Sequence, residues 1–306
     1  MSKSVKIPSI LRSFVRNAPQ YQHMPSGALL GKAWQWLAGF AYFLKQEILY
    51  FQKSRNRLKP LRQMKNTKRG LPVLIIGNGP SSATLTVDQA KRLRLQNAGV
   101  ISMNNYDKTE VSRDVIPDFH VLLDPEYQRE EFGSRKSILA YLESHPEIQL
   151  IQSSIVAKPL NWPGRTLFLN GIQAVGLWRS NSPLKANTYP QGVLVSALKL
   201  ADFLGYSPIF VTGIDNSFYR HHFHNQIGEV IIHTDGLHSY SDEDEGKFAK
   251  TIPYLTRNMS DVLFAHAIFL RELKKFSKGK VIVNVGLTDL TNDAFPFGCL
   301  LPRKPD

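Results

Sequence analysis

The chain has 306 residues, of which 42% are hydrophobic and 21% charged, a composition that excludes a disordered or collagen-like protein. Its single cysteine, Cys299, excludes an intramolecular disulfide, and because no secretory signal is recognisable we expect a cytoplasmic protein. The net charge of +13 lies in residues 1–70, which hold 14 Lys and Arg against one acid, Glu47, whereas the other residues balance. We therefore expect a basic leader over 1–70 and a globular domain over 71–306.

The leader combines an aromatic block with a basic tract. Residues 33–44 (AWQWLAGFAYFL) are uncharged and lie between Lys32 and Lys45; they are too few for a membrane-spanning helix, which needs roughly 20 apolar residues, and their helical spacing predicts an interfacial helix. The tract 53–69 adds eight Lys and Arg and no acid, each worth about 1 kcal/mol near an anionic leaflet.

From these two signals we expect the leader to bind an anionic membrane surface, peripherally, at the inner face of the cell membrane. The alternative is that its helix packs on the domain or on another subunit, with the basic tract as a solvated linker. Nucleic acid is not the expected partner, because the aromatic residues form one block and are not interleaved with the basic ones.

From residue 71 onward, apolar runs alternate with helical patterns. Strands are predicted at 71–76, 99–103, 119–123, 148–151, 166–169, 209–212 and 281–285, and helices near 85–97, 136–142, 192–204 and 261–276. This alternation predicts an α/β fold with a mostly parallel sheet, Rossmann-like, and helices on both faces. Ligands of such sheets bind beyond the carboxyl ends of the strands.

The first predicted strand ends in a glycine turn, Gly77-Asn78-Gly79. A glycine turn between a strand and a helix suits a phosphate, although a tight turn without a ligand is the alternative. The dinucleotide fingerprint would need a third glycine where Ser82 stands and an acid where Asn104 ends the second strand, so NAD and FAD are disfavoured. No GxxxxGK[ST] motif occurs, which excludes a P-loop NTPase.

Four segments carry a resemblance to a known family. They are 74–81 (LIIGNGPS), 102–105 (SMNN), 191–215 (QGVLVSALKLADFLGYSPIFVTGID) and 282–297 (IVNVGLTDLTNDAFPF). In this order and spacing they resemble the bacterial sialyltransferases of lipooligosaccharide synthesis and the related central domain of the motility-associated flagellin glycosyltransferases. The resemblance implies an inverting transfer of a nonulosonic (sialic-type) or Kdo-type sugar from CMP to a surface glycan or glycolipid, with no metal or other cofactor.

The resemblance also implies site residues. Asn78 and Asn104 match the family asparagines that contact the nucleotide, and the implied nucleotide site comprises Gly77, Asn78, Gly79, Ser81, Asn104, Gly213 and Asp215. The expected substrate contacts are Asn105, Asp124, Gln191 and Thr288. Two departures concern the donor sugar: Asp124-Pro125 stands where the family has Asn-Pro, and residues 188–191 replace an Arg/Ser approach to the following helix.

Five of the nine histidines lie in residues 221–238. Gly236-Leu237-His238-Ser239 matches the family's Gly-x-His-Ser, which implies His238 as the general base, with His233 as the next candidate. Tyr219, or alternatively Tyr240, corresponds to the tyrosines that support the leaving phosphate. The histidines at 221, 222 and 224 suggest zinc, but adjacent histidines in one loop without a cysteine rarely converge on one ion, so no metal is expected.

Two other functions stay open from the sequence. One is a 6-hydroxymethylpterin diphosphokinase-like enzyme, since an archaeal family with that activity shares a similar domain; it would need ATP and Mg²⁺. The other is a non-catalytic membrane-associated adaptor. The sequence does not decide the donor sugar, the acceptor, or whether the chain forms a homo-oligomer.

Overall fold

The computed structural model describes a defined part of the chain. It covers residues 56–124 except 86, and then 127, 133–154, 156, 158–160, 162, 166–170, 181–185, 193–214, 222–224, 230–232, 269–270, 273–286, 294, 296 and 298. The aromatic block of the leader lies outside these residues.

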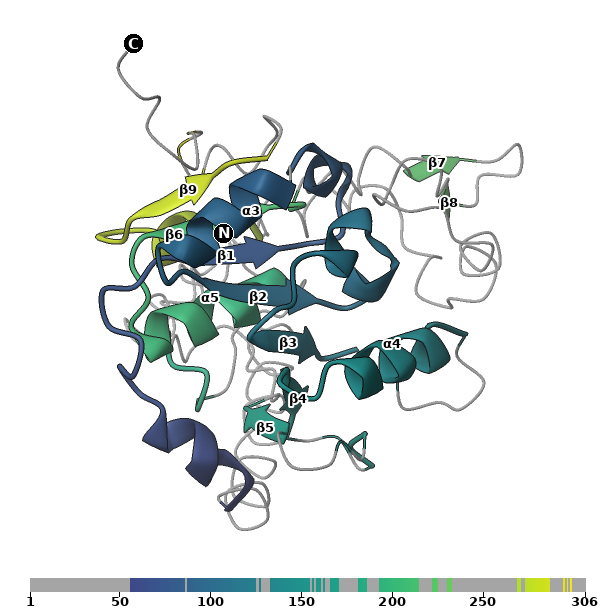
Figure 1. Ribbon diagram of the computed structural model, residues 1–306, viewed down its shortest axis with the longest axis horizontal. Helices are drawn as coiled ribbons and strands as arrows, with labels where there is room; N and C mark the ends of the chain where they lie inside the picture. The colour runs from purple at the N-terminus through teal and green to yellow at the C-terminus, as the bar shows by residue number, and fades with distance from the viewer. Residues whose placement is uncertain are drawn as a thin grey trace, which may run out of the picture.

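A sheet of seven parallel strands forms the centre of the domain (Figure 1). Its strands are β1 (Val73–Ile76), β2 (Gly99–Met103), β3 (Phe119–Leu122), β4 (Gln149–Ser153), β5 (Thr166–Leu169), β6 (Ile209–Thr212) and β9 (Ile282–Asn284). They are ordered β5-β4-β3-β2-β1-β6-β9, and every neighbouring pair is parallel. The predicted α/β, Rossmann-like sheet is confirmed, and all seven predicted strands are present.

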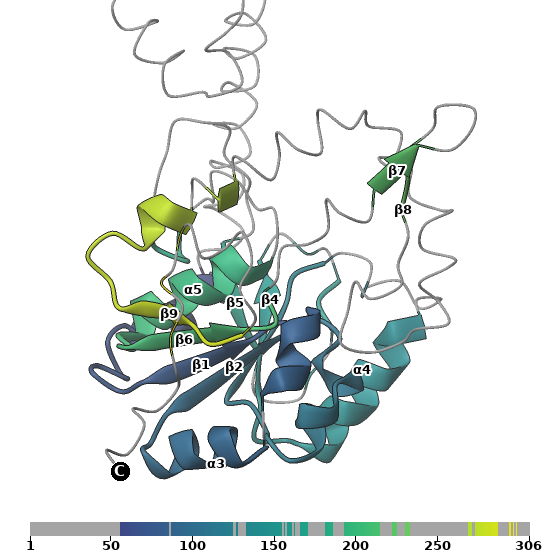
Figure 2. The ribbon, with the colours of Figure 1, turned by 90° about the horizontal axis from the view of Figure 1, so that it is seen from above.

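Helices cover both faces of the sheet, as predicted. The α-helices are α3 (Val87–Leu95), α4 (Gly133–Ser144) and α5 (Val193–Leu204), and the 3₁₀ helices are η2 (Pro80–Thr84), η3 (Tyr106–Lys108) and η4 (Glu110–Arg113). Figure 2 shows α3 and α5 on opposite sides of the sheet. Of the predicted helix 261–276, only 269–270 and 273–276 are described, and they are helical.

The alternation of side chains along β1 explains these two layers. Val73 and Ile75 belong to the buried cluster that includes α5, whereas Leu74 and Ile76 pack with Ala90 of α3 on the opposite face. Because successive side chains of a strand point to opposite faces, an apolar strand of this kind needs a cover on each side. The run of apolar residues in β1 therefore agrees with a sheet buried on both faces.

Residues 56–70, the part of the predicted leader that the structure describes, form a further layer on the α5 side. Residues 56–63 are helical, and Leu61 is fully buried in the cluster that contains α5. Three backbone hydrogen bonds follow, from the N–H of Asn66, Lys68 and Gly70 to the carbonyl oxygens of residues 203, 204 and 205, at 3.0, 2.8 and 3.0 Å. This stretch is thus an ordered part of the domain surface and not a solvated linker.

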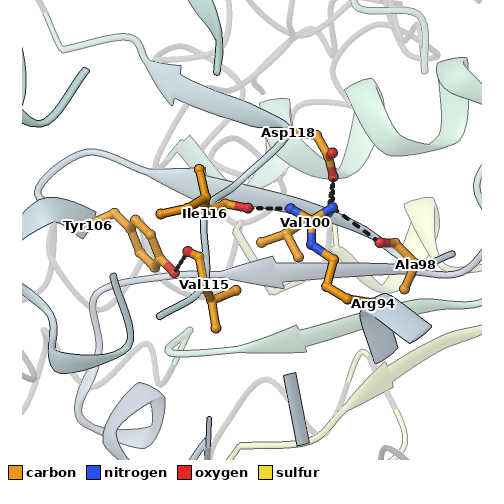
Figure 3. A network of polar contacts seen from close by, with 7 residues as sticks. All are labelled: Arg94, Ala98, Val100, Tyr106, Val115, Ile116 and Asp118. Atoms are coloured by element: carbon orange, nitrogen blue, oxygen red, sulfur yellow. Dashed lines mark hydrogen bonds and ion pairs between the residues drawn. The ribbon is translucent and has the colours of Figure 1, made fainter. Parts of the chain in front are cut away.

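At the amino ends of β2 and β3 a polar network fastens α3 to the sheet (Figure 3). Arg94, at the end of α3, donates to Asp118 Oδ2 at 2.7 Å and to the carbonyl of Ile116. The same Asp118 oxygen accepts the N–H of Val100 at 2.7 Å. One carboxylate therefore connects a helix to two strands, at the edge opposite the one where a ligand is expected.

Candidate ligand site at the carboxyl edge of the sheet

The strand order places a topological switch point beside β1. The chain proceeds outward from β1 to β5 and then returns to the other side of β1 as β6. In open α/β sheets, ligands bind at this point, outside the carboxyl ends of the strands. The loops after β1, β2, β3 and β6 carry eight of the predicted site residues to this edge, namely Gly77, Asn78, Gly79, Ser81, Asn104, Asn105, Asp124 and Gly213.

The glycines of this edge hold two loops together. The N–H of Gly77 donates to the carbonyl of Thr212 and that of Gly79 to the carbonyl of Gly213, both at 2.8 Å. A Cβ on Gly77 would lie 2.2 Å from the Gly213 oxygen, so only glycine permits this approach. Ser81 completes the junction, since its Oγ accepts the N–H of Gly213 at 2.9 Å.

This junction changes the interpretation of the glycine turn. The sequence suggested that the backbone N–H groups of the turn bind a phosphate, but those of Gly77 and Gly79 are already donated to the segment after β6. Hydrogen bonds made within the protein would have to be exchanged for those to a ligand. Ligand contacts from these two N–H groups are therefore disfavoured, whereas the side chain of Asn78 keeps a buried oxygen without a partner.

Two asparagines at this edge hold buried acceptors without a partner. The Oδ1 atoms of Asn78 and Asn104 are buried and accept no hydrogen bond, and Ser82 Oγ is in the same condition. Because Ile76 and Ser102 are register partners in neighbouring strands, Asn78 and Asn104 follow the carboxyl ends of two adjacent strands. Buried polar atoms in native proteins nearly always have a partner, so a donor from a ligand or a water is expected here.

Asn104 has a left-handed backbone, with φ of 47°. Asparagine tolerates this conformation better than most residues, which fits its place at the abrupt end of β2. Its N–H still continues the sheet ladder to the carbonyl of Val121 at 3.1 Å. The side chain is thereby held in place by a backbone that is bonded to the sheet.

A buried Ser–His pair lies directly below Asn104. Ser102 and His120 are register partners in β2 and β3, both fully buried, with 2.8 Å between Ser102 Oγ and His120 Nδ1. Burial lowers the pKa of His120 to about 3, while the backbone of Asn104 opposes that shift, so the imidazole is neutral at pH 7. Its Nε2 is a further buried atom without a partner.

This pair was not predicted from the sequence. Residues 119–123 were interpreted only as an apolar strand, although a histidine within a strand that is otherwise apolar was visible. What the sequence lacked was the register that sets His120 opposite Ser102. That register follows from the pairing of β2 with β3 over Ile101–Met103 and Phe119–Val121.

The outer part of the edge is built by groups after β2 and β3. Asn105 Oδ1 accepts the hydroxyl of Tyr127 at 2.5 Å, and Lys108 Nζ donates to Ser134 Oγ, at the start of α4, at 2.9 Å. Lys108 thus adds a positive charge to the segment after β2, which also carries Asn104 and Asn105. Tyr127, Lys108 and Ser134 were not among the predicted site residues, because only the fold brings them to this edge.

Several predicted site residues lie outside the described residues. They are Gln191, Asp215, Tyr219, His238, Tyr240 and Thr288, and the second base candidate His233 is also among them. Within the histidine-rich segment the structure describes β7 (His222–His224) and β8 (Val230–Ile232), which pair as antiparallel strands. The predicted base and the predicted phosphate-supporting tyrosines therefore stay predictions.

Over the described ranges, no group of three or more His, Cys, Asp or Glu residues is arranged to hold a metal ion. In the same ranges, no helix has both the length and the apolar character needed to cross a bilayer. No family model matches this chain, and neither does any curated protein. The structure itself thus defines an α/β protein of Rossmann-like fold. The edge at its switch point is polar and holds buried side-chain oxygens that have no hydrogen-bond partner.

Proposed function

We propose that this protein is a glycosyltransferase that moves a nonulosonic or Kdo-type sugar from its CMP-activated form to a surface glycan or glycolipid. The observation that carries the proposal is the pair of buried, unpartnered Oδ1 atoms of Asn78 and Asn104. These are the two positions at which the family resemblance expects contacts to the nucleotide. A cytidine nucleotide offers an amino group and ribose hydroxyls, which are the donors that two such acceptors require.

The proposed reaction is a single displacement at the anomeric carbon. His238 takes the proton of the acceptor hydroxyl as its oxygen forms the new bond. The bond from the anomeric carbon to the phosphate oxygen breaks, and CMP leaves with the electron pair. Tyr219 or Tyr240 donates to the phosphate as its charge increases. One displacement inverts the anomeric configuration, and the scheme assigns no step to a metal or other cofactor.

The remaining predicted residues surround the sugar in this scheme. Asn105, Asp124, Gln191 and Thr288 are assigned to the donor sugar or the acceptor. The bond from Tyr127 to Asn105 supports a fixed orientation of that carboxamide. A carboxylate at position 124, in place of the family's asparagine, would favour a donor that presents hydroxyl or amide N–H groups there and would disfavour a negatively charged group.

The first prediction concerns nucleotide binding. Asn78→Ala and Asn104→Gly should each weaken CMP binding about tenfold in calorimetry, which is the value of about one hydrogen bond. Glycine at 104 deletes the carboxamide while accepting the left-handed backbone. Asn97→Gly is the matched control, because Asn97 also has a positive φ, 58°, but is exposed on the turn after α3.

Absence of CMP binding by the unmodified protein would contradict the proposal, and so would affinities of the two variants equal to that of the control. Addition of EDTA should leave CMP binding unchanged. Binding of ATP that depends on Mg²⁺ would instead support the pterin diphosphokinase alternative.

The second prediction concerns the general base. With a panel of CMP-sugars, His238→Ala should reduce CMP release by about 10²-fold or more, as expected for loss of a general base, and should leave CMP affinity unchanged within about twofold. His233→Ala is the matched control and should retain turnover. The opposite pattern, with turnover lost only in His233→Ala, would move the base to His233.

A further inference from the structure

Residues 56–70 have two chemically different sides. Leu58 and Leu61 are 5% and 0% exposed and face the domain. Four cationic side chains of this segment are exposed, two on the helix of residues 56–63 and two in the turns that follow it, on the side away from the buried leucines. These four, which we call the cationic ridge, are Lys59, Arg62, Lys65 and Arg69.

No charge within the described part of the chain compensates the cationic ridge. The ion pairs found there join Lys91 to Asp114, Arg94 to Asp118 and Lys280 to Asp202, and none involves a ridge residue. In the sequence, no acid occurs between Glu47 and Asp88. Like charges on one segment that no described acid pairs with repel one another, and an anionic surface would relieve that repulsion.

The cationic ridge is also held firmly. At its start, Arg57 Nη1 donates to the carbonyls of Ser154 and Val156 at 3.0 and 3.1 Å, and its guanidinium lies 5.3 Å from the centroid of the Phe168 ring. At its end, the three backbone bonds to residues 203–205 attach residues 66–70 to the domain. The charges are therefore presented by an ordered scaffold, so little backbone entropy is lost when a partner binds.

We propose that the cationic ridge docks this domain on an anionic lipid bilayer. Residues 56–70 contain no aromatic side chain, so the ridge lacks the stacking platforms typical of single-stranded nucleic acid sites. The sequence just before it holds the aromatic block 33–44, of the kind that settles at the headgroup level. An interfacial helix and a basic surface are the two signals that together give stable membrane association.

The position of the cationic ridge also sets the orientation of the bound domain. Residues 66–70 lie beside the end of α5, next to the amino ends of β1 and β6, at the lower left of Figure 1. The candidate ligand edge lies at the other end of these strands, about 13 Å away for a strand of four residues. The start of the ridge, by contrast, lies beside the carboxyl ends of β4 and β5, where Arg57 is bonded to Ser154 and Val156. Docking through the ridge therefore leaves α3, on the opposite face of the sheet, turned away from the bilayer.

Binding of the full-length chain to vesicles tests the docking surface. Vesicles of equimolar phosphatidylcholine and phosphatidylserine should bind a variant with Lys59, Arg62, Lys65 and Arg69 all changed to Gln at least tenfold more weakly than the unmodified chain. The matched control changes four exposed cations elsewhere to Gln, namely Arg92, Arg113, Lys136 and Lys278. It should lose no more than about threefold, which allows for the change in net charge.

Equal losses in the two variants would overturn the proposal. It would also be overturned if the ridge variant bound vesicles like the control but lost binding to duplex DNA. Both measurements use no nucleotide sugar or acceptor, so failure of the proposed transferase activity would leave this result unaffected.

Site-specific labels test the orientation. In a Cys299→Ser background, an environment-sensitive fluorophore on Gln63→Cys, beside the ridge, should shift to the blue when phosphatidylserine vesicles are added. The same label on Gln96→Cys, exposed after α3 on the opposite face, should not shift. A shift at position 96 without one at position 63 would show that another face meets the membrane.

Discussion

At the scale of single residues, the carboxyl edge of the sheet has backbone groups that are hydrogen-bonded to one another and side-chain oxygens that accept no hydrogen bond. Gly77, Gly79 and Gly213 use their backbone groups on one another and on Thr212, whereas Asn78 and Asn104 keep a buried oxygen without a donor. The glycines thus serve the close packing of two loops, and the asparagines are the groups that the proposed function assigns to the nucleotide. This division refines the glycine-turn hypothesis, which credited the backbone with phosphate binding.

The buried imidazole of His120 predicts a pH dependence of stability. Its pKa of about 3 in the folded protein lies below the value of about 6.5 in an unfolded chain, so between these values the unfolded state binds the extra proton. The free energy of unfolding should therefore fall as the pH decreases below 6.5, by about 1 kcal/mol between pH 6.5 and pH 5.5 from this residue alone. Urea unfolding at the two pH values measures the change.

Variants isolate the contribution of His120. His120→Asn should remove about 1 kcal/mol of the pH-dependent loss relative to the unmodified chain. Ser102→Ala leaves the imidazole buried and should retain the full dependence. A pH dependence of His120→Asn identical to that of the unmodified chain would show that the histidine is not titrated on unfolding.

At the scale of elements, the helix α3 is held at its two ends by different means. Its apolar residues Ala90 and Leu93 pack under β1 and β2, while Arg94 at its end reaches Asp118 and Ile116 across the amino edge. The junction after β1 fixes the loop that precedes the helix.

Arg94 should matter more for stability than a neighbouring ion pair of the same helix. Arg94→Met is expected to lower the free energy of unfolding by about 1–2 kcal/mol, because it removes the Arg94 donor to the Ile116 carbonyl and one of the two donors to the Asp118 carboxylate, which keeps only the N–H of Val100. Lys91→Met should cost less than about 0.5 kcal/mol, since the side chains of Lys91 and Asp114 are 58% and 46% exposed and exposed pairs contribute little. Equal losses in urea unfolding would contradict this ranking.

At the scale of the whole molecule, the domain extends beyond the boundary that charge alone suggested. The change in composition at residue 71, where the excess of basic residues ends, predicted that the globular domain begins there. The structure shows residues 56–70 packed on α5 and bonded to its carboxyl end. The same segment therefore contributes to the core with one side and carries the cationic ridge on the other.

Truncation of one leucine in this segment tests its membership of the core. Leu61→Ala should lower the free energy of unfolding by about 2–4 kcal/mol, the usual cost for a fully buried leucine, in a single transition seen alike by circular dichroism and tryptophan fluorescence. Leu95→Ala is the control, because Leu95 is 85% exposed and should change stability by less than about 0.5 kcal/mol. A Leu61→Ala cost as small as that of Leu95→Ala would mean that the segment is not part of the cooperative unit.

Local patterns in the sequence were sufficient to predict the strands of the sheet and two of the helices that cover it. Apolar runs of four to six residues, each followed by a glycine or a polar residue, predicted the seven strands of the sheet. Helical spacing predicted α4 and α5, because burial on one or both faces acts on each element by itself. The excess of positive charge in residues 1–70 was likewise a property of the sequence alone.

Only the tertiary structure decided what the polar groups do. Hydrogen bonds such as those from Gly77 to Thr212 and between Ser102 and His120 join residues distant in the chain, and their partners depend on strand order and register, which local patterns do not encode. The same holds for residues 56–70, because the buried position of Leu61 depends on its packing in the cluster that contains α5. The sequence thus predicted where the charge lies. Long-range packing decided which buried polar atoms have a hydrogen-bond partner within the protein and which do not, because strand order and register set those partners.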